Sequence, residues 1–271
     1  MKMRMIRAGF LLCIFFLVAS CTIEKQWEFE ERIALDGIHP IGIDSDRENL
    51  WLSDGDNNRL VMLNSDFKTV KVLEEFDRPM HIDISEGNIF VPEYGSDTIR
   101  IVNDGKRSAM DVTVALDAPA GVDVAGNHIC IADFYGHQVV FFDSMQWVTI
   151  GKKGTDPGEL FYPTDCQIKK GKIYMADAYN HRIQVFDFQG NSIQIFGNEE
   201  EMNASTGIFL SDDKIFITDF ENGRVLIYDY SGSLKQILDQ GINKPTDILI
   251  YNEDLLITDF ESSALVRYVL K

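Results

Sequence analysis

The chain has 271 residues, of which 45% are hydrophobic, 11% are aromatic and 25% are charged. This composition excludes a disordered chain, and the length is sufficient to bury a sizeable core. The formal net charge of −18 argues against nucleic acid as a partner and against electrostatic docking on an anionic membrane.

Residues 1–20 have the features of a secretory signal peptide. Three basic residues near the start form an n-region, and residues 8–18 form an apolar h-region that is too short to span a bilayer. The segment ends in the run VASC, which resembles the lipobox of bacterial lipoproteins, so we predict lipidation at Cys21. Residues 21–26 are then a lipidated tether. The alternative is ordinary secretory cleavage, with Cys21 incidental.

This N-terminus predicts where in the cell the protein is located. Cleavage before Cys21 leaves a mature chain of charge −21, so acyl chains rather than charge would hold it at a membrane. We expect a membrane-anchored lipoprotein of the bacterial cell envelope, on the periplasmic or the outer-membrane side. Cys130 and Cys166 lie in apolar strand patterns, where we expect buried free thiols; in an oxidising compartment a disulfide between them is the alternative.

From residue 40 onward, the chain repeats one pattern six times with a period of 39–44 residues. Each copy reads as a strand, a short turn, a second strand that ends in an acid, a polar loop and a third strand. The copies start at Pro40, Pro79, Pro119, Pro163, Ser205 and Pro245. In each copy the acid follows 14 residues after the start, at Asp54, Glu93, Asp133, Asp177, Asp219 and Asp259.

The six copies predict an all-β, six-bladed β-propeller over residues 27–271. Near-continuous apolar runs in the strands indicate sheets that are covered on both faces, and repeated sheets of about forty residues are typical of propeller blades. An open solenoid is the rival architecture, but it requires polar capping repeats. The sixth copy stops after its third strand, so we expect residues 27–35 to supply the missing outer strand and close the ring.

The repeats resemble those of NHL-repeat six-bladed propellers. The most diagnostic stretches are GKKGTDPGELFYPTD at 151–165 and ADAYNHRIQVFD at 176–187, which the fifth copy repeats as TDFENGRVLIYD at 218–229. The resemblance weakens at Thr98 and Ala264, which replace the usual Arg. Together with the lipobox, the chain resembles the six-bladed propeller lipoproteins of Bacteroidetes-type envelopes.

Positions two residues after each start are predicted to meet at the mouth of the central channel. In the second, fourth and sixth copies they hold His81, Asp165 and Asp247, and in the other copies they hold glycine. A histidine and two carboxylates that converge on one axis form a plausible site for a divalent metal ion, which is the cofactor such a site would take. The alternative is a wet channel whose polar groups bond only backbone and water.

The loops after the second strands carry aromatic residues that we expect around the same mouth. They are Tyr94, Phe134, Tyr135, Tyr179, Phe220 and Phe260. Aromatic rings among acids could receive a peptide, a sugar or a cationic group, or they could pack between blades. The strand-end acids themselves are interpreted as structural, since Arg59, Arg182 and Arg224 follow three of them by five residues. His137 and His181 share one loop position, where they could join a metal or remain without a specific role.

Two classes of function follow from this sequence. The first is a lipid-anchored binding or interaction module for a protein, a peptide or a glycan. The second is a metal-dependent enzyme similar to the propeller lactonases and lyases, which use His and acidic ligands around the channel. We favour the binding module, because the amidating lyases carry His on several inner strands where this chain has only His81. The sequence does not indicate an oligomeric state.

Overall fold

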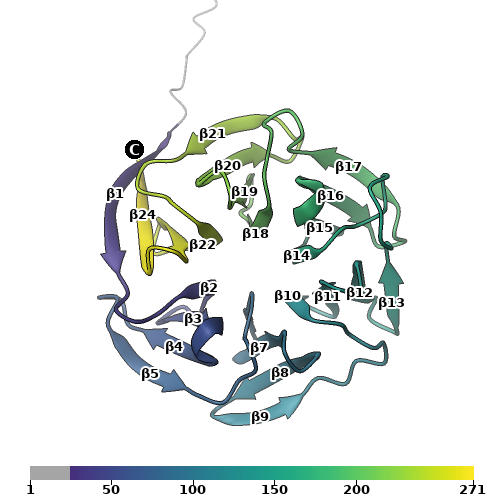
Figure 1. The fold of residues 1–271 in the computed structure, drawn as a ribbon, viewed down its shortest axis with the longest axis horizontal. Helices are drawn as coiled ribbons and strands as arrows, with labels where there is room; N and C mark the ends of the chain where they lie inside the picture. Colours follow the sequence, from purple (N-terminus) through teal and green to yellow (C-terminus); the bar gives the residue numbers. More distant parts are fainter. Residues whose placement is uncertain (1–24) are drawn as a thin grey trace, which may run out of the picture.

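The computed structural model describes residues 25–271, which form six four-stranded antiparallel sheets arranged as blades around a central axis (Figure 1). This is the predicted six-bladed β-propeller. The predicted signal peptide and Cys21 lie outside the described residues. Within residues 25–271, no helix is long and apolar enough to cross a bilayer.

In each blade the first strand lies nearest the axis and the fourth lies at the rim. The strands of blades one to three are β2 (Pro40–Ser45), β3 (Leu50–Asp54), β4 (Arg59–Leu63) and β5 (Thr69–Leu73); β6 (Asp83–Ser85), β7 (Asn88–Glu93), β8 (Thr98–Asn103) and β9 (Lys106–Ala109); and β10 (Pro119–Ala125), β11 (His128–Asp133), β12 (Gln138–Phe142) and β13 (Trp147–Ile150).

The remaining blades follow the same order, and two 3-10 turns, η1 (Gly55–Asn57) and η2 (Ala178–Asn180), lie in loops after second strands. The strands of blades four to six are β14 (Pro163–Lys169), β15 (Lys172–Asp177), β16 (Arg182–Asp187) and β17 (Ser192–Phe196); β18 (Ser205–Leu210), β19 (Lys214–Asp219), β20 (Arg224–Asp229) and β21 (Leu234–Leu238); and β22 (Pro245–Tyr251), β23 (Asp254–Asp259), β24 (Ala264–Leu270) and β1 (Trp27–Ala34).

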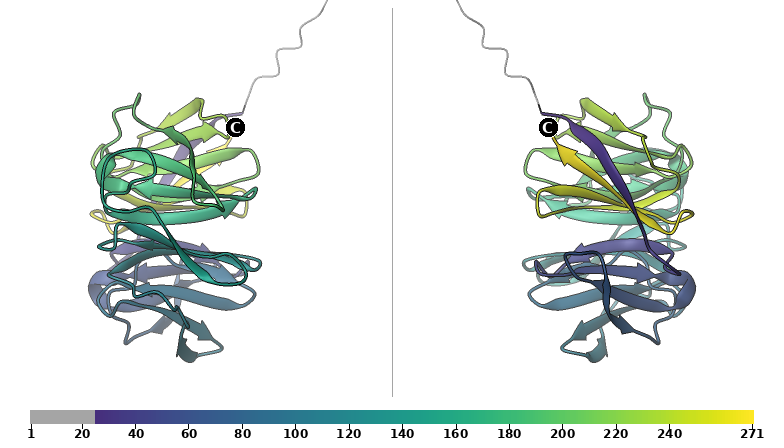
Figure 2. Two further views of the ribbon diagram at one scale, coloured as in Figure 1. Left: turned by 90° about the vertical axis from the view of Figure 1, so that its right-hand side faces the viewer. Right: turned by 90° about the vertical axis from the view of Figure 1, so that its left-hand side faces the viewer.

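The N-terminal strand closes the ring, as predicted. β1 pairs antiparallel with β24, with Trp27 opposite Leu270 and Ala34 opposite Ala264, so blade six combines both ends of the chain. Figure 2 shows β1 beside the yellow C-terminal strand on the outer rim. Gln236 of blade five accepts a hydrogen bond from the Trp27 amide at 3.0 Å and donates one to its carbonyl at 2.7 Å. The closing strand is therefore tied to two blades.

Apolar side chains from facing sheets fill the spaces between blades. One cluster joins blades three and four and includes both cysteines, which are fully buried free thiols, as expected. Burial raises the pKa of the Cys166 thiol, which keeps it protonated and unreactive. Because each sheet is covered on both faces, its strands read as continuous apolar runs rather than alternating ones.

The six strand-end acids hold the loop that enters their own blade. Each is buried, and each accepts a hydrogen bond from a backbone amide one or two residues before the start of that blade. In blade four, for example, Phe161 donates to Asp177 Oδ1 at 2.7 Å. The carboxylates thus replace water for loop amides that no strand pairs, which agrees with their structural interpretation.

A side-chain hydrogen-bond donor or a cation lies beside each of these acids. Arg59, Arg182 and Arg224 pair with the acid of their own blade at 2.6–2.8 Å, as their spacing predicts. In the three copies that have no Arg five residues after the acid, other side chains pair with it. Arg100 pairs with Glu93 at 2.7 Å, Gln138 donates to Asp133 at 2.8 Å, and Arg32 of the closing strand lies 3.8 Å from Asp259.

Candidate functional site

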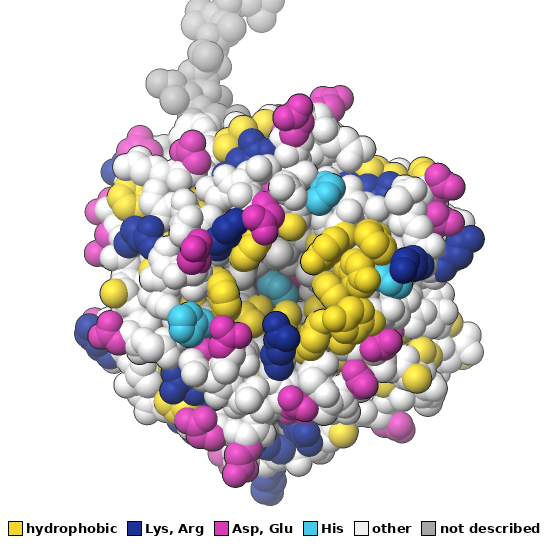
Figure 3. All heavy atoms as spheres, in the orientation of Figure 1, with side chains coloured by type: hydrophobic (Ala, Val, Ile, Leu, Met, Phe, Trp, Pro, Cys, Tyr) yellow, Lys and Arg dark blue, Asp and Glu magenta, His cyan; other side chains and the backbone are white. Residues whose placement is uncertain are grey.

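The innermost segments of the six blades bring His81, Asp165 and Asp247 together on the axis. One ligand atom from each of these residues lies within 4.8 Å of the others, and all three residues are buried. We call them the channel trio. They come from blades two, four and six, so the alternation with glycine becomes a threefold arrangement. Figure 3 shows the centre of the ring hollowed, with a histidine side chain visible there.

The three glycines between them make this arrangement possible. A β-carbon on Gly42 would lie 2.8 Å from the Cα of His81, and one on Gly121 would lie 2.8 Å from the Cα of Asp165. A β-carbon on Gly207 would lie 2.9 Å from the Cα of Asp247. These distances are too short for carbon atoms in contact. The six inner segments can therefore approach this closely only if every second one has glycine at this position.

Backbone amides fix both carboxylates of the channel trio. Asp165 accepts from the amide of Ile208, in the next blade, and from that of Cys166, both at 2.8 Å. Asp247 accepts from the amide of Ile43 at 2.9 Å, across the ring closure. The pKa of Asp165 is raised to about 7, because burial and the neighbouring Asp247 carboxylate outweigh the opposing effect of His81.

His81 is held by its backbone, while its ring nitrogen Nδ1 has no hydrogen-bond partner. The His81 amide donates to the Ala120 carbonyl of blade three at 3.0 Å. Nδ1 is buried and lies 3.4 Å from Asp247 Oδ2. Burial by itself lowers the pKa of His81, but the carboxylates of Asp247 and Asp165 outweigh it, so the pKa is raised. This donor set suits either a divalent metal or a protonated imidazole.

A second layer of carboxylates lies two residues further along the inner strands and was not predicted. Asp44, Asp83 and Asp123 line, with the channel trio, a cavity of about 270 Å³. Asp44 and Asp123 accept from amides of neighbouring inner strands at 2.6 and 2.8 Å, while one oxygen of Asp83 is buried without a partner. Burial raises the pKa of Asp44 to about 7 and that of Asp123 to about 6. All three lie four residues after the start of their sequence copy, and this shared position could have predicted them.

Aromatic side chains of blades two to four form one cluster beside the mouth of the channel (Figure 3). We call it the aromatic patch, and it comprises Tyr94, Phe134, Tyr135, Phe161, Tyr162 and Tyr179. Ring centroids of neighbouring members lie 4.5–5.7 Å apart, within the range of favourable aromatic pairs. Tyr135 and Tyr179 are 49% and 54% exposed, so the patch presents rings to solvent.

The patch contains four of the six predicted aromatic residues. Phe220 lies under Lys244, whose Nζ is 5.0 Å from its ring centroid, and Phe260 packs against His39 at 5.8 Å; neither contacts the patch. Phe161 and Tyr162, which sequence reasoning missed, complete it. They immediately precede Pro163. Two aromatic residues in a loop that enters a blade could have predicted their place in the patch.

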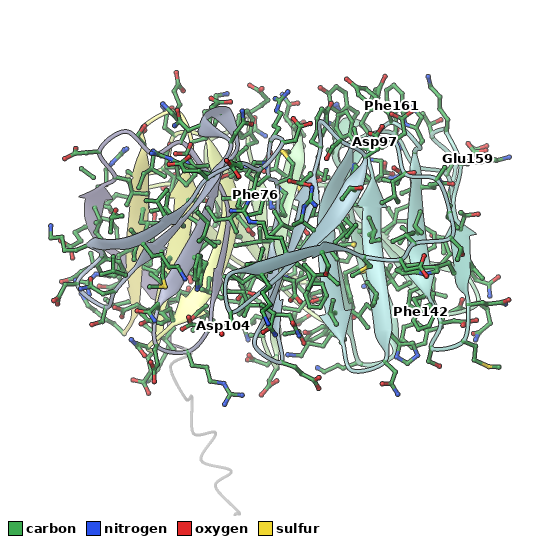
Figure 4. The ribbon with its side chains drawn as sticks, turned by 90° about the horizontal axis from the view of Figure 1, so that it is seen from below. Phe76, Asp97, Asp104, Phe142, Glu159 and Phe161 are labelled. Atoms are coloured by element: carbon green, nitrogen blue, oxygen red, sulfur yellow. The ribbon has the colours of Figure 1, made fainter. Side chains whose placement is uncertain are left out.

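The aromatic patch and the start of β1 lie on opposite faces of the disc. Figure 4 shows Phe161 and Asp97 on one face and Asp104 and Phe142 on the other. Phe142 ends the third strand of its blade, and Leu270 ends the corresponding strand of blade six, where it pairs with Trp27. The described chain therefore begins on the face remote from the patch.

His137 and His181 do not join the channel trio. Each accepts a backbone hydrogen bond on Nδ1 at 3.1 Å, from Tyr162 and from Ala204 respectively, and so links its loop to the next blade. Both residues have a left-handed backbone conformation, with φ of 52° and 55°. Their shared loop position thus has a structural explanation.

No protein-family model matches this chain, and no curated protein matches it. Among solved structures, it is similar to a streptogramin B lyase (TM-score 0.68, 13% identity, covering 89% of this chain and 97% of that one). A catalytically inactive virginiamycin B lyase from Staphylococcus aureus with quinupristin is also similar (TM-score 0.67, 18% identity, covering 90% and 88%). So is the WD40 β-propeller domain of Doa1 (TM-score 0.64, 13% identity, covering 84% and 77%). At these identities the likeness shows the fold alone, which lyases and WD40 domains share.

Proposed function

We propose that this protein is a lipid-anchored binding module of the bacterial cell envelope, similar to the NHL-repeat propeller lipoproteins, that takes a protein, peptide or glycan on its aromatic patch. The observation that supports this best is the patch itself, because six clustered rings with two half-exposed tyrosines are an unusual surface for a solvated loop region. Tyrosine offers a large apolar area and a polar hydroxyl at low conformational cost, which suits recognition.

The position of the N-terminal strand supports an outward-facing patch. An anchor at Cys21 would lie six residues before Trp27, and a fully extended chain of that length reaches about 20 Å. Because β1 begins on the opposite face, such a tether would hold that face towards the membrane. The aromatic patch would then point away from the lipid, where a soluble or surface-bound partner can reach it.

Binding to peptide and glycan arrays tests this proposal. The mature protein in detergent is applied to both arrays beside the double variant Tyr135→Ala/Tyr179→Ala, which removes the two most exposed rings of the patch. We expect the variant to lose at least about tenfold in affinity for the ligands that the parent retains, as for central aromatic contacts in other interfaces.

Met145→Ala is the matched control for the array experiment. Met145 is 88% exposed and follows β12 on the opposite face, so its removal changes exposed apolar area without touching the patch. Its binding should equal that of the parent. Equal binding by the tyrosine double variant, or an absence of specific ligands on both arrays, would contradict the proposal.

A metal-dependent enzyme, similar to the lactonases or lyases, is the second candidate. It is favoured by the channel trio, which collects a His and two carboxylates at one buried point. Incubation with quinupristin, the compound present in one of the similar lyase structures, tests it most directly. We expect metal-dependent loss of the compound by mass spectrometry, with no loss for Asp165→Asn. Equal rates for the two proteins would remove this candidate.

A further inference from the structure

We propose that the channel trio binds one divalent transition-metal ion, of which Zn²⁺ is the representative, between a ring nitrogen of His81 and the carboxylates of Asp165 and Asp247. The proposal is independent of the aromatic patch, so it can hold whether or not the module is an enzyme. It rests on the distances, on the buried nitrogen that makes no hydrogen bond, on the anchored carboxylates and on the acidic groups that line the cavity.

The spacing of the donor atoms matches a metal site. Ligands bound tetrahedrally at about 2.0–2.1 Å from Zn²⁺ lie roughly 3.4 Å from one another. His81 Nδ1 and Asp247 Oδ2 are 3.4 Å apart, and donor atoms of all three residues lie within 4.8 Å. A small movement of the side chains would complete the set.

His81 Nδ1 is a buried donor atom that makes no hydrogen bond, although it lies 3.4 Å from Asp247 Oδ2. His81 is only 4% exposed, yet this nitrogen has no hydrogen-bond partner. Buried polar atoms are normally paired, because leaving one unpaired costs the free energy of its desolvation. A metal ion between Nδ1 and the two carboxylates would satisfy this atom without any change of the backbone.

Backbone amides hold both carboxylates of the channel trio close to His81. Amides of Ile208 and Ile43, which belong to blades five and one, each donate to one of them and fix its direction. A carboxylate oxygen that accepts one hydrogen bond keeps a second lone pair for a metal. Hydrogen bonds of this kind around ligating groups are usual in metal sites and raise their affinity.

The acidic groups around the site also favour a cation. Asp44, Asp83 and Asp123 line the same cavity as the channel trio. Lys169 also lines it, but its Nζ is bonded to the Leu210 carbonyl and lies 3.2 Å from Asp212. Five carboxyl groups therefore face this cavity with one lysine that is already paired. Burial raises the pKa of Asp44, Asp123 and Asp165, and a bound cation would favour their ionised form.

The donor types select the class of ion. An imidazole nitrogen with two carboxylates suits Zn²⁺, Mn²⁺ or Fe²⁺, whereas Ca²⁺ and Mg²⁺ prefer oxygen donors only. Three protein ligands leave a further position that would face the 270 Å³ cavity. The competing possibility is that a protonated His81 pairs with the two carboxylates and locks the blades together without metal.

Metal content and affinity measured on the full mature protein distinguish these two arrangements. After chelation and equilibrium dialysis against Zn²⁺, we expect one ion per chain by elemental analysis and a higher melting temperature than for the chelated protein. Asp165→Asn and His81→Gln should each weaken Zn²⁺ binding at least about a hundredfold. Asp123→Asn, which removes a carboxylate from the same cavity but not from the trio, should change it by less than about tenfold.

Cobalt substitution keeps the test valid if a variant fails to fold. With Co²⁺ in the parent protein, visible absorption bands of a low-symmetry, four- or five-coordinate ion with a nitrogen ligand should appear and saturate at one equivalent. Binding below one equivalent for Zn²⁺ and Co²⁺, or unchanged affinity in a folded Asp165→Asn variant, would overturn the proposal and leave the ion-paired lock. Neither result bears on binding at the aromatic patch.

Discussion

Arg182 has the least exposed side chain of the arginines that pair with strand-end acids, at 9%. Its Nε donates to Asp177 at 2.7 Å, and its terminal nitrogens donate to the carbonyls of Thr155, Asp156 and Glu159 at 2.8–3.1 Å. Arg182→Ala would leave the fully buried Asp177 carboxylate without its countercharge. Breaking one side of a buried pair costs about 3–5 kcal/mol. For a domain of this size, that corresponds to a fall in melting temperature of about 6–20 °C.

Urea and thermal unfolding, followed by circular dichroism, measure this cost. Lys152→Ala is the control, because Lys152 forms a 3.2 Å pair with Glu159 in the same loop but its side chain is 76% exposed. The control should change the free energy of unfolding by less than about 0.5 kcal/mol. A cost below about 1 kcal/mol for Arg182→Ala would refute the reasoning and would assign the stability of this loop to apolar packing of Leu160.

Three further predictions concern the anchor, the closure and the axis. Cys21→Ser should release the protein from the membrane fraction or leave it uncleaved; a variant that is still processed before residue 21 and still sediments with membranes would exclude lipidation. Deletion of 27–35 should cause aggregation or non-cooperative melting, because it exposes the edge of β24. Deletion of 22–26, which removes the backbone pair between Gln26 and Lys271, should leave the melting temperature nearly unchanged; similar melting curves for the two deletions would contradict closure by β1. Gly121→Ala should cost about 1–3 kcal/mol in urea unfolding, since the new β-carbon would meet the backbone of Asp165; unchanged stability would mean that the inner strands can separate freely.

The sequence alone was sufficient to predict the ring and its closure. A fixed offset of 14 residues between start and acid recurs because each acid must reach the loop entering its own blade, as Phe161 and Asp177 show. The spacing from start to acid is the same in every copy, so this constraint is local and appears as a repeat. The proximity of the channel trio was predictable for the same reason, since equivalent positions in alternate blades of a ring must meet on its axis.

Only the tertiary structure decided which side chains meet across strands and across blades. Arg100 and Arg32 replace the arginines missing at Thr98 and Ala264, and Arg32 does so from the other end of the chain. Arg100 reaches Glu93 from the neighbouring strand of the same blade. No sequence spacing encodes the contact of Arg32 with Asp259, because it forms only when β1 closes the ring. Likewise, the aromatic patch gathers rings from three neighbouring blades but excludes the equivalent ones of blades five and six. Its membership follows from how each entering loop packs on the next blade, which depends on side-chain contacts across blades rather than on the repeat.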